Sequence, residues 1–281
     1  MIIEIIPFDI SIDNEGFSYF IKDELVDQIS IWSIVEIPVK NKIIYWIVGK
    51  MNVEYREENI KSIVGIACSM PVLDEYQIKT IYDLSGRYFV NIHKILNLFL
   101  PQFIFKGLEN KSFVDLEKTQ INKKMKNERL LIFNKSNEIN SIILDLIEKW
   151  ENIVLVFADD YMINDFLEKN ENIEEQAIIY KNKFTSNKKY KTFVSIFNRT
   201  KKIIIWTRKV LLYNLKAYEK IIYIEDSFIK YIYSYEHKYK NTDLLKYIWK
   251  NWNFDINIVS TIPLIESVHK AIEKEYKIIN I

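Results

Sequence analysis

Two acids follow a short apolar run in the last third of the chain. Ile221–Ile224 is too short for a helix and rich in Ile, so it predicts a buried strand of a parallel sheet. Glu225 and Asp226 come directly after it. Open α/β sheets place ligands at the carboxyl ends of their strands. A pair of acids there can hold magnesium and orient an attacking water in nucleotide hydrolysis. The pair is therefore a candidate catalytic site.

Glycine content limits that chemistry. The chain has five glycines, and none lies beyond Gly107. Phosphate-binding loops need glycine, because their backbone N–H groups approach the phosphates closely and their backbone adopts positive φ. A glycine-rich nucleotide loop is therefore excluded from the part of the chain that carries Glu225 and Asp226.

Apolar runs and helical patterns alternate from Arg129 onward. The expected strands are Leu130–Phe133, Ile153–Phe157, Ala177–Tyr180, Ile203–Trp206, Ile221–Ile224 and Ile256–Val259. The expected helices are Ile139–Trp150, Tyr161–Glu168, Lys188–Phe197, Leu244–Trp252 and Leu264–Glu273. Such alternation predicts a mostly parallel sheet covered on both faces.

The N-terminal part has a different pattern. Residues 1–70 contain short apolar runs that predict a small antiparallel sheet or barrel, with one strand ending at Pro38. Asp74 opens a helix that Gly86 can end, and a second short helix stops at Pro101. We expect three segments: a β-rich domain over 1–105, a linker over 106–127 and a parallel α/β domain over 128–281.

Composition fits a soluble globular protein of 281 residues, with 49% hydrophobic and 27% charged residues. No apolar run approaches the ~18–20 residues that span a membrane, and the acidic start does not predict a signal peptide. The lone cysteine, Cys68, excludes internal disulfides and multi-cysteine zinc sites, and lies in an apolar stretch typical of a core residue. We expect a cytoplasmic protein without membrane contact. Residues 1–110 carry an excess of acidic residues, and residues 111–281 carry an excess of basic residues. The basic excess indicates either a mild preference of the second part for polyanions or an ordinary surface of mixed charge.

Several blocks resemble one family in order and spacing. They are GFSYFIKDELVDQISIWSIVEIPVKNKIIYWIVGKM, LSGRYFVNIHKILNLFLP, IIIWTRKVLL, IIYIEDSF and IVSTIPLIESVHKAIEKEYKIINI. Together they resemble primosomal protein N′ (PriA), a replication-restart helicase family. The resemblance implies a 3′-DNA-end-binding domain followed by the first RecA-like lobe of a helicase. The family's winged-helix domain, second lobe and cysteine-rich zinc module have no counterpart in this sequence.

The resemblance also implies which residues contact DNA. The positions that match the family's 3′-end pocket are Phe17, Ser18, Lys40 and Lys61. Ser18 stands where the family has Asp, and Lys40 where it has Gly. Arg208 and Lys238 match basic positions of the lobe. The alternative is that Phe17 belongs to the core and the lysines to a solvated surface.

The motor motifs are degenerate. The place of the family's phosphate loop reads Lys135-Ser136 without glycines, a P-loop relic or an ordinary surface helix start. The family's DEEH box reads Glu225-Asp226-Ser227-Phe228, and its GSAT motif reads Val259-Ser260-Thr261-Ile262. We therefore expect that the ATP and Mg²⁺ binding of the family is lost and that zinc is absent.

The expected function is DNA binding in replication or replication restart, on forked or 3′-ended DNA at a junction of single strand and duplex, without ATP hydrolysis or unwinding. One alternative is a protein–protein interaction scaffold with replisome or primosome partners. Another is a helicase half that a separate chain completes.

Overall fold

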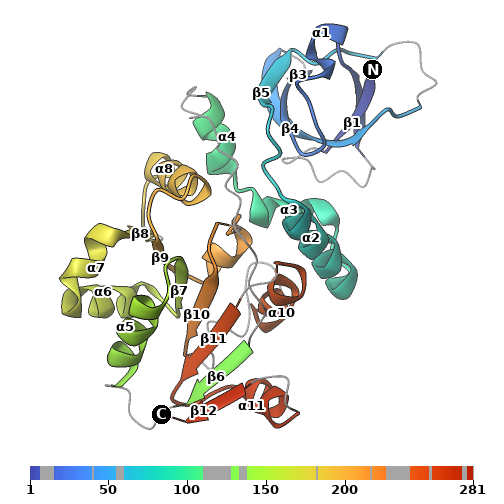
Figure 1. Ribbon diagram of the computed structural model, residues 1–281. Coiled ribbons are helices and arrows are strands. Elements are labelled where there is room, and N and C mark those ends of the chain that lie inside the picture. Colours follow the sequence, from blue (N-terminus) through green and yellow to red (C-terminus); the bar gives the residue numbers. More distant parts are fainter. Residues whose placement is uncertain are drawn as a thin grey trace. The chain divides into compact units, whose positions relative to one another are not determined.

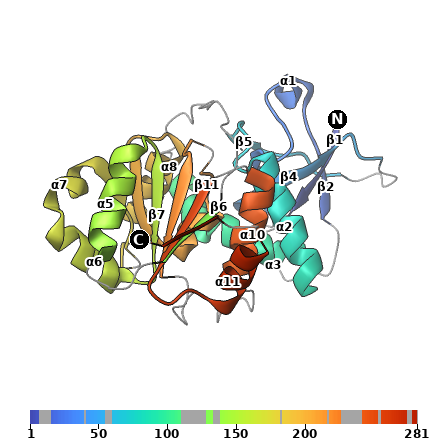
Figure 2. The same ribbon diagram turned by 60° about the horizontal axis from the view of Figure 1, so that its bottom comes forward.

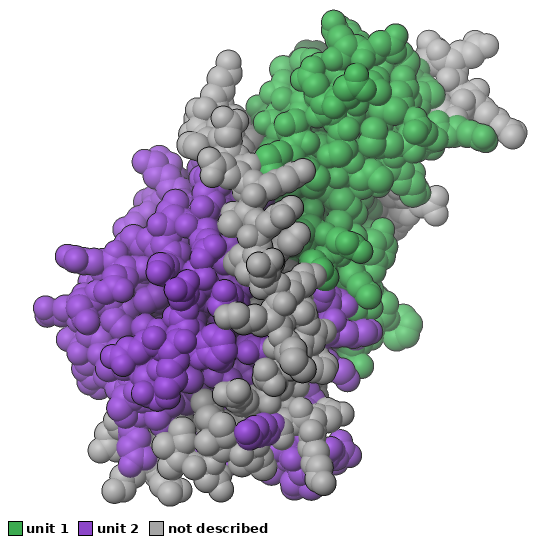
Figure 3. Space-filling model, in the orientation of Figure 1, with its two compact units in different colours: residues 1–116 green, residues 117–281 purple. Residues whose placement is uncertain are grey.

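The computed structural model divides into two compact units, residues 1–116 and 117–281 (Figures 1 and 3). It describes residues 1–6, 16–39, 41–54, 60–109, 128–132, 138–181, 183–215, 217–225, 241–252, 255–273 and 277–280. Within these ranges no helix has the length and apolarity needed to cross a bilayer.

The first unit is built on a five-stranded antiparallel sheet in the order β2-β1-β4-β3-β5 (Figure 1). Its elements are β1 (Ile2–Ile6), β2 (Phe17–Phe20), α1 (Asp23–Val26), β3 (Ile34–Val39), β4 (Lys42–Met51), β5 (Gly65–Cys68), α2 (Glu75–Tyr88), α3 (Ile92–Phe99) and α4 (Gln102–Glu109). Alternate residues of β1, Ile3 and Ile5, are fully buried, as expected for a strand with one core-facing side.

In α2, the sequence correctly predicted where the helix begins but not where it ends. Asp74 caps α2 in a capping box, because its side chain accepts from Gln77 N–H while the Gln77 side chain accepts from Asp74 N–H. The helix does not end at Gly86. It continues to Tyr88 and ends at Phe89, whose φ of 50° is left-handed.

One further expectation for the first unit was wrong. β3 does not stop at Pro38 but continues to Val39. At Pro38 the strand pairs only with β4, since its pairing with β5 ends at Glu36, and proline is tolerated where one side of a strand is open. A third helix, α4, extends from the expected domain into the expected linker.

The second unit contains a seven-stranded parallel sheet in the order β12-β6-β11-β10-β7-β9-β8. Its strands are β6 (Glu128–Ile132), β7 (Ile153–Phe157), β8 (Ala177–Ile179), β9 (Ile203–Thr207), β10 (Lys220–Ile224), β11 (Asp255–Ser260) and β12 (Lys277–Asn280). Its helices are α5 (Ile139–Lys149), α6 (Asp160–Lys169), α7 (Glu171–Gln176), α8 (Ser186–Phe197), η2 (Arg208–Leu212), α10 (Asn241–Trp252) and α11 (Ile265–Ile272). The predicted fold class, a β-rich unit followed by a parallel α/β unit, is confirmed.

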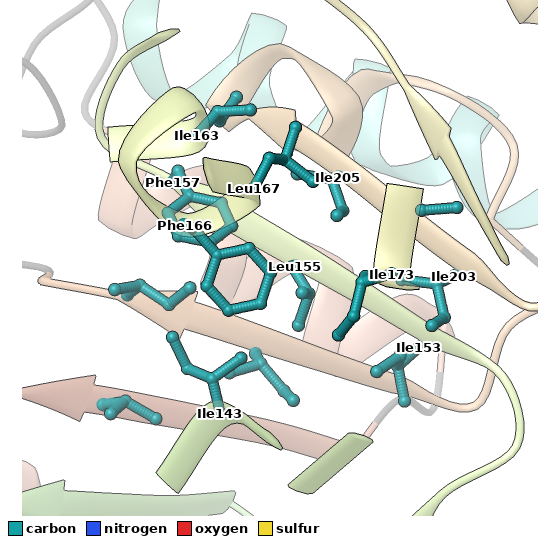
Figure 4. Packing of buried hydrophobic residues seen from close by; sticks show 14 of the residues in the cluster. Ile143, Ile153, Leu155, Phe157, Ile163, Phe166, Leu167, Ile173, Ile203 and Ile205 are labelled. Atoms are coloured by element: carbon teal, nitrogen blue, oxygen red, sulfur yellow. The ribbon is translucent and has the colours of Figure 1, made fainter. Parts of the chain in front are cut away.

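The central strands β7, β9, β10 and β11 are buried along their whole length. On one face, Leu155, Phe157 and Ile205 pack with Ile143 of α5 and Phe166 of α6 in a single apolar cluster (Figure 4). Ile173 of α7 belongs to the same cluster, and Figure 2 shows α5, α6 and α7 grouped on one side of the sheet.

The opposite face carries an aromatic stack. Successive strand residues point to opposite faces, so Trp206 faces away from Ile205 and its cluster. The Trp206 ring stacks between Tyr180 and Tyr213, with ring centroids 3.5 and 4.8 Å away. Tyr213 contacts Phe193 of α8 at 5.6 Å. Helix α8 therefore covers the face opposite to α5, α6 and α7.

Cys68, at the end of β5, is 8% exposed, which confirms the expectation of a core cysteine. Burial raises the pKa of its thiol from 9.0 to about 11. Because the thiolate is the nucleophile, a pKa raised by two units lowers the reactive fraction at pH 8 by about 100-fold.

We predict that Cys68 in the native protein reacts with DTNB at pH 8 at least about 100-fold more slowly than in urea-unfolded protein. Raising the pH toward 10 should speed the native reaction. Equal native and unfolded rates would contradict a buried thiol, and the single cysteine makes the readout unambiguous.

Candidate functional site

The carboxyl ends of three adjacent strands meet at one edge of the parallel sheet. β6, β11 and β10 are neighbours, so the residues that follow them are brought together. Glu225 follows β10, and Ser260 closes β11. The acid is thus where the sequence predicted. Its neighbour Asp226 and the possible P-loop relic, Lys135 and Ser136, lie outside the described residues.

The Glu225 carboxylate accepts three hydrogen bonds from the end of β11. Oε2 accepts from Ser260 Oγ at 2.9 Å and from Thr261 N–H at 3.2 Å, and Oε1 accepts from Thr261 Oγ1 at 2.8 Å. The side chain is 8% exposed. Its backbone N–H donates to Val259 O at 2.8 Å, which extends the strand ladder by one bond.

The backbone of Glu225 is in the left-handed region, with φ of 54°. This conformation is uncommon for a residue other than glycine. The turn and the three donors hold both carboxylate oxygens against the Ser260-Thr261 end of β11. In this arrangement Glu225 joins two strand ends. Within the described ranges, no cluster of three or more His, Cys, Asp or Glu residues could hold a metal ion.

Arg208 begins η2 directly after β9. Thr207, the last residue of β9, is buried. In η2 the buried side chains are those of Val210, Leu211 and Leu212. Arg208 itself is half-buried. In the part of the chain that the structure describes, its guanidinium makes no ion pair or hydrogen bond. The other basic position predicted in this unit, Lys238, lies outside the described residues.

In the first unit, three of the four predicted DNA contacts lie on or beside the edge strand β2. Phe17 and Ser18 open the strand and face opposite sides of it, because they are adjacent. Lys61 is exposed, and its carbonyl accepts from Phe20 N–H at 2.9 Å at the other end of β2. Lys40 lies outside the described residues.

Phe17 has a packing partner within the sheet. Its ring stacks on the buried Trp46 ring, with centroids 5.3 Å apart and planes 27° apart, and it is half-buried. Phe17 thus packs partly against the core side of the sheet. Its predicted role in stacking a base stays a prediction.

Sequence reasoning missed a polar row beside Ser18. Glu4 of β1 is the cross-strand neighbour of both Ser18 and Lys50, so the three side chains share one face. Lys50 Nζ lies 3.1 Å from Glu4 Oε1. The signal was a single acid between Ile3 and Ile5 in an otherwise apolar run.

Gly16 allows the start of β2 to lie close to Glu4 and Ile5 of β1. Its φ is 121°, and an added Cβ would lie 2.8 Å from Glu4 Cγ and 2.9 Å from the Ile5 carbonyl oxygen. A side chain at this position would therefore push β2 away from β1.

Removing the donors to Glu225 should destabilise the second unit. We predict that the Ser260→Ala/Thr261→Val variant loses about 3 kcal/mol of unfolding free energy, because a buried carboxylate loses two hydroxyl donors. Urea denaturation at pH 7 measures the loss. A Ser141→Ala/Thr200→Val control removes two exposed hydroxyls and should cost under about 1 kcal/mol. Equal losses in both variants would contradict the described network.

Comparison with known proteins gives one match of sequence. Residues 6–101, about a third of the chain, match the profile of the PriA 3′DNA-binding domain (3′BD). No curated protein sequence matches. Two solved structures resemble the chain in fold only distantly. They are the C-terminal domain of S. cerevisiae Dbp5 bound to Gle1 and IP6 (7% identity, 56% of this chain, 89% of that chain, TM-score 0.42) and the C-terminal domain of the DEAD-box protein Dbp5 (9%, 55%, 89%, 0.39). Both likenesses are too distant to inform function. The established similarity is therefore that of residues 6–101 to the PriA 3′DNA-binding domain.

Proposed function

We propose that this protein binds 3′-ended or forked DNA through its first unit, in DNA replication or replication restart, without hydrolysing ATP or unwinding the duplex. The observation that carries the proposal is the match of residues 6–101 to the 3′DNA-binding domain. That match covers β2 to β5 of the first sheet, and Phe17, Ser18 and Lys61 lie on or beside β2.

The chemistry of these residues suits the end of a DNA strand. Exposed Lys61 offers a cation to a phosphate. Ser18 offers a hydroxyl to the terminal sugar, beside the Glu4–Lys50 pair. Phe17 faces the other side of β2, where its ring stacks on Trp46 and stays partly exposed, so in this proposal it contacts a base across the edge of the strand.

The second unit, in this proposal, descends from the first RecA-like lobe of a helicase and has lost catalysis. The absence of glycine after Gly107 supports the loss of a phosphate-binding loop. The engagement of Glu225 with Ser260 and Thr261 supports it further, because these donors compete for the oxygens that Mg²⁺ would need. ATP and Mg²⁺ are therefore not part of the proposed function, and zinc has no role in it.

A second candidate function is a contact with replisome or primosome proteins. Exposed isoleucines on and just before α11, the helix that follows β11, favour it. Ile262, Ile265 and Ile272 are 73%, 80% and 72% exposed. From Ile265 the spacing of seven residues to Ile272 places them on one side of α11. A protein scaffold, or a helicase half completed by a separate chain, would use such a surface.

We predict salt-sensitive binding of 3′-tailed forks in a fluorescence anisotropy titration, with a 3′-hydroxyl end preferred over a 3′-phosphate end. Lys61→Ala should lower the slope of log affinity against log salt by about 0.7–0.9, the value of one phosphate contact. Lys79→Ala, an exposed lysine on α2, is the matched control and should leave the slope unchanged. No salt-sensitive binding at micromolar protein would refute the proposal.

We also predict no saturable heat when Mg–ATP is titrated into the protein in a calorimeter, because the sequence has no glycine after Gly107 with which to build a backbone cradle for the phosphates. An active P-loop ATPase serves as the positive control. Saturable binding would instead support the helicase half that a separate chain completes.

A further inference from the structure

Helix α2 of the first unit carries aromatic side chains on the side that faces away from its packing partner, α3, which lies beside it (Figures 1 and 2). A helix that buries one face is expected to be polar on the other. The opposite side of α2 carries Tyr82, which is 57% exposed, and Phe89, directly after the last helical residue, is 96% exposed. The buried residues of α2 are Gln77, Thr80, Ile81 and Leu84.

The backbone of Phe89 is in the left-handed region, with φ of 50° and ψ of 39°. Glycine adopts this conformation more readily than a bulky residue does. Three hydrogen bonds fix the turn, because the N–H groups of Phe89 and Val90 both donate to Ser85 O and Ser85 Oγ donates to Val90 O at 2.7 Å. The exposed ring adds almost no burial that would offset the strain. Such a residue points to a contact outside the chain.

Gly86 lies between the two aromatic residues, four positions after Tyr82 and three before Phe89. These spacings place the three residues along one side of the helix. A Cβ added to Gly86 would meet no atom within 4 Å, so the fold does not require glycine there, and glycine inside a helix is destabilising relative to alanine. It leaves a notch that lets another helix approach closely. We name Tyr82, Gly86 and Phe89 the α2 stripe.

The charged residues of α2 alternate in sign at a spacing of four. They are Glu75, Lys79, Asp83 and Arg87. Because acids and bases are equal in number, this flank has no net charge that would attract a nucleic acid or an anionic membrane. The pattern instead complements itself. When a second α2 runs antiparallel, with residue 81 of both helices at the same height, Glu75 lies opposite Arg87 and Lys79 lies opposite Asp83. The twofold axis repeats each pair.

We propose that two copies of this chain associate through an antiparallel pair of α2 helices. In this register the two Tyr82 rings meet beside the twofold axis, and Phe89 of each copy lies over the first turn of the other helix. The notch at Gly86 admits the Ile78 side chain of the second copy. The proposal does not depend on the proposed function, because it involves neither DNA nor β2.

The expected dimer is weak, because a pair of 14-residue helices buries less area than a typical stable interface. We expect a Kd of about 10 µM for the full chain, measured by sedimentation equilibrium. A protein that stays monomeric at about 100 µM, ten times that value, would overturn the proposal.

Charge reversal tests the register. Glu75→Lys/Asp83→Lys makes the flank of α2 wholly basic, and Lys79→Glu/Arg87→Glu makes it wholly acidic. Each variant alone should raise the dimer Kd at least about tenfold, because like charges then face one another. An equimolar mixture of the two should associate again, since every pair across the interface is then attractive. A mixture that associates no more tightly than either variant alone would contradict the antiparallel pairing.

The matched control is Glu171→Lys/Glu175→Lys, which reverses two exposed acids of α7. It changes the net charge as much as the basic α2 variant does and should leave the Kd unchanged. Thermal unfolding verifies that every variant folds. A control that weakens the dimer as much as the α2 variants would show that only overall charge matters, and the proposal would be wrong.

Gly86→Leu tests the α2 stripe without a change of charge. The monomer has open space at this position and leucine favours helix, so the thermal midpoint should not fall. The dimer Kd should rise at least about tenfold, because the leucine fills the notch. A wild-type dimer that keeps its Kd in Gly86→Leu and in Phe89→Ser would place the contact elsewhere and overturn the proposal. A monomeric wild type that loses DNA affinity in Phe89→Ser would overturn it in favour of base stacking.

Discussion

Burial of the parallel sheet on both faces is the constraint on which the second unit depends. β7, β9, β10 and β11 are apolar along their whole length, and such strands are stable only when helices cover both sides. Parallel strands also deliver all their carboxyl ends to one edge. The position of Glu225, its contact with Ser260 and the placement of Arg208 all follow from that geometry.

Side-chain packing holds the sheet of the second unit together. The apolar cluster and the Tyr180–Trp206–Tyr213 stack need neither glycine nor a bound nucleotide. Glu225 has a structural role in this sheet, since its carboxylate joins the ends of β10 and β11.

Patterns of neighbouring residues predicted many of the strands and helices. Contacts between residues far apart in the sequence could not be predicted, because they depend on the order of the strands in each sheet. The run Ile221–Ile224 was enough to predict a buried strand with Glu225 at its end. That Ser260 and Thr261 would donate to Glu225 could not be predicted, because it depends on β11 lying beside β10. Likewise Phe17 lies 29 residues before Trp46 in the chain, and only the strand order brings their rings together.

The central claim is that a DNA 3′ end binds at β2 of the first unit. A photoreactive 3′-terminal nucleotide, cross-linked to the full chain and located by peptide mass spectrometry, tests it directly. The account predicts cross-links within residues 16–22 or 60–63. Cross-links confined to residues 117–281 would contradict it.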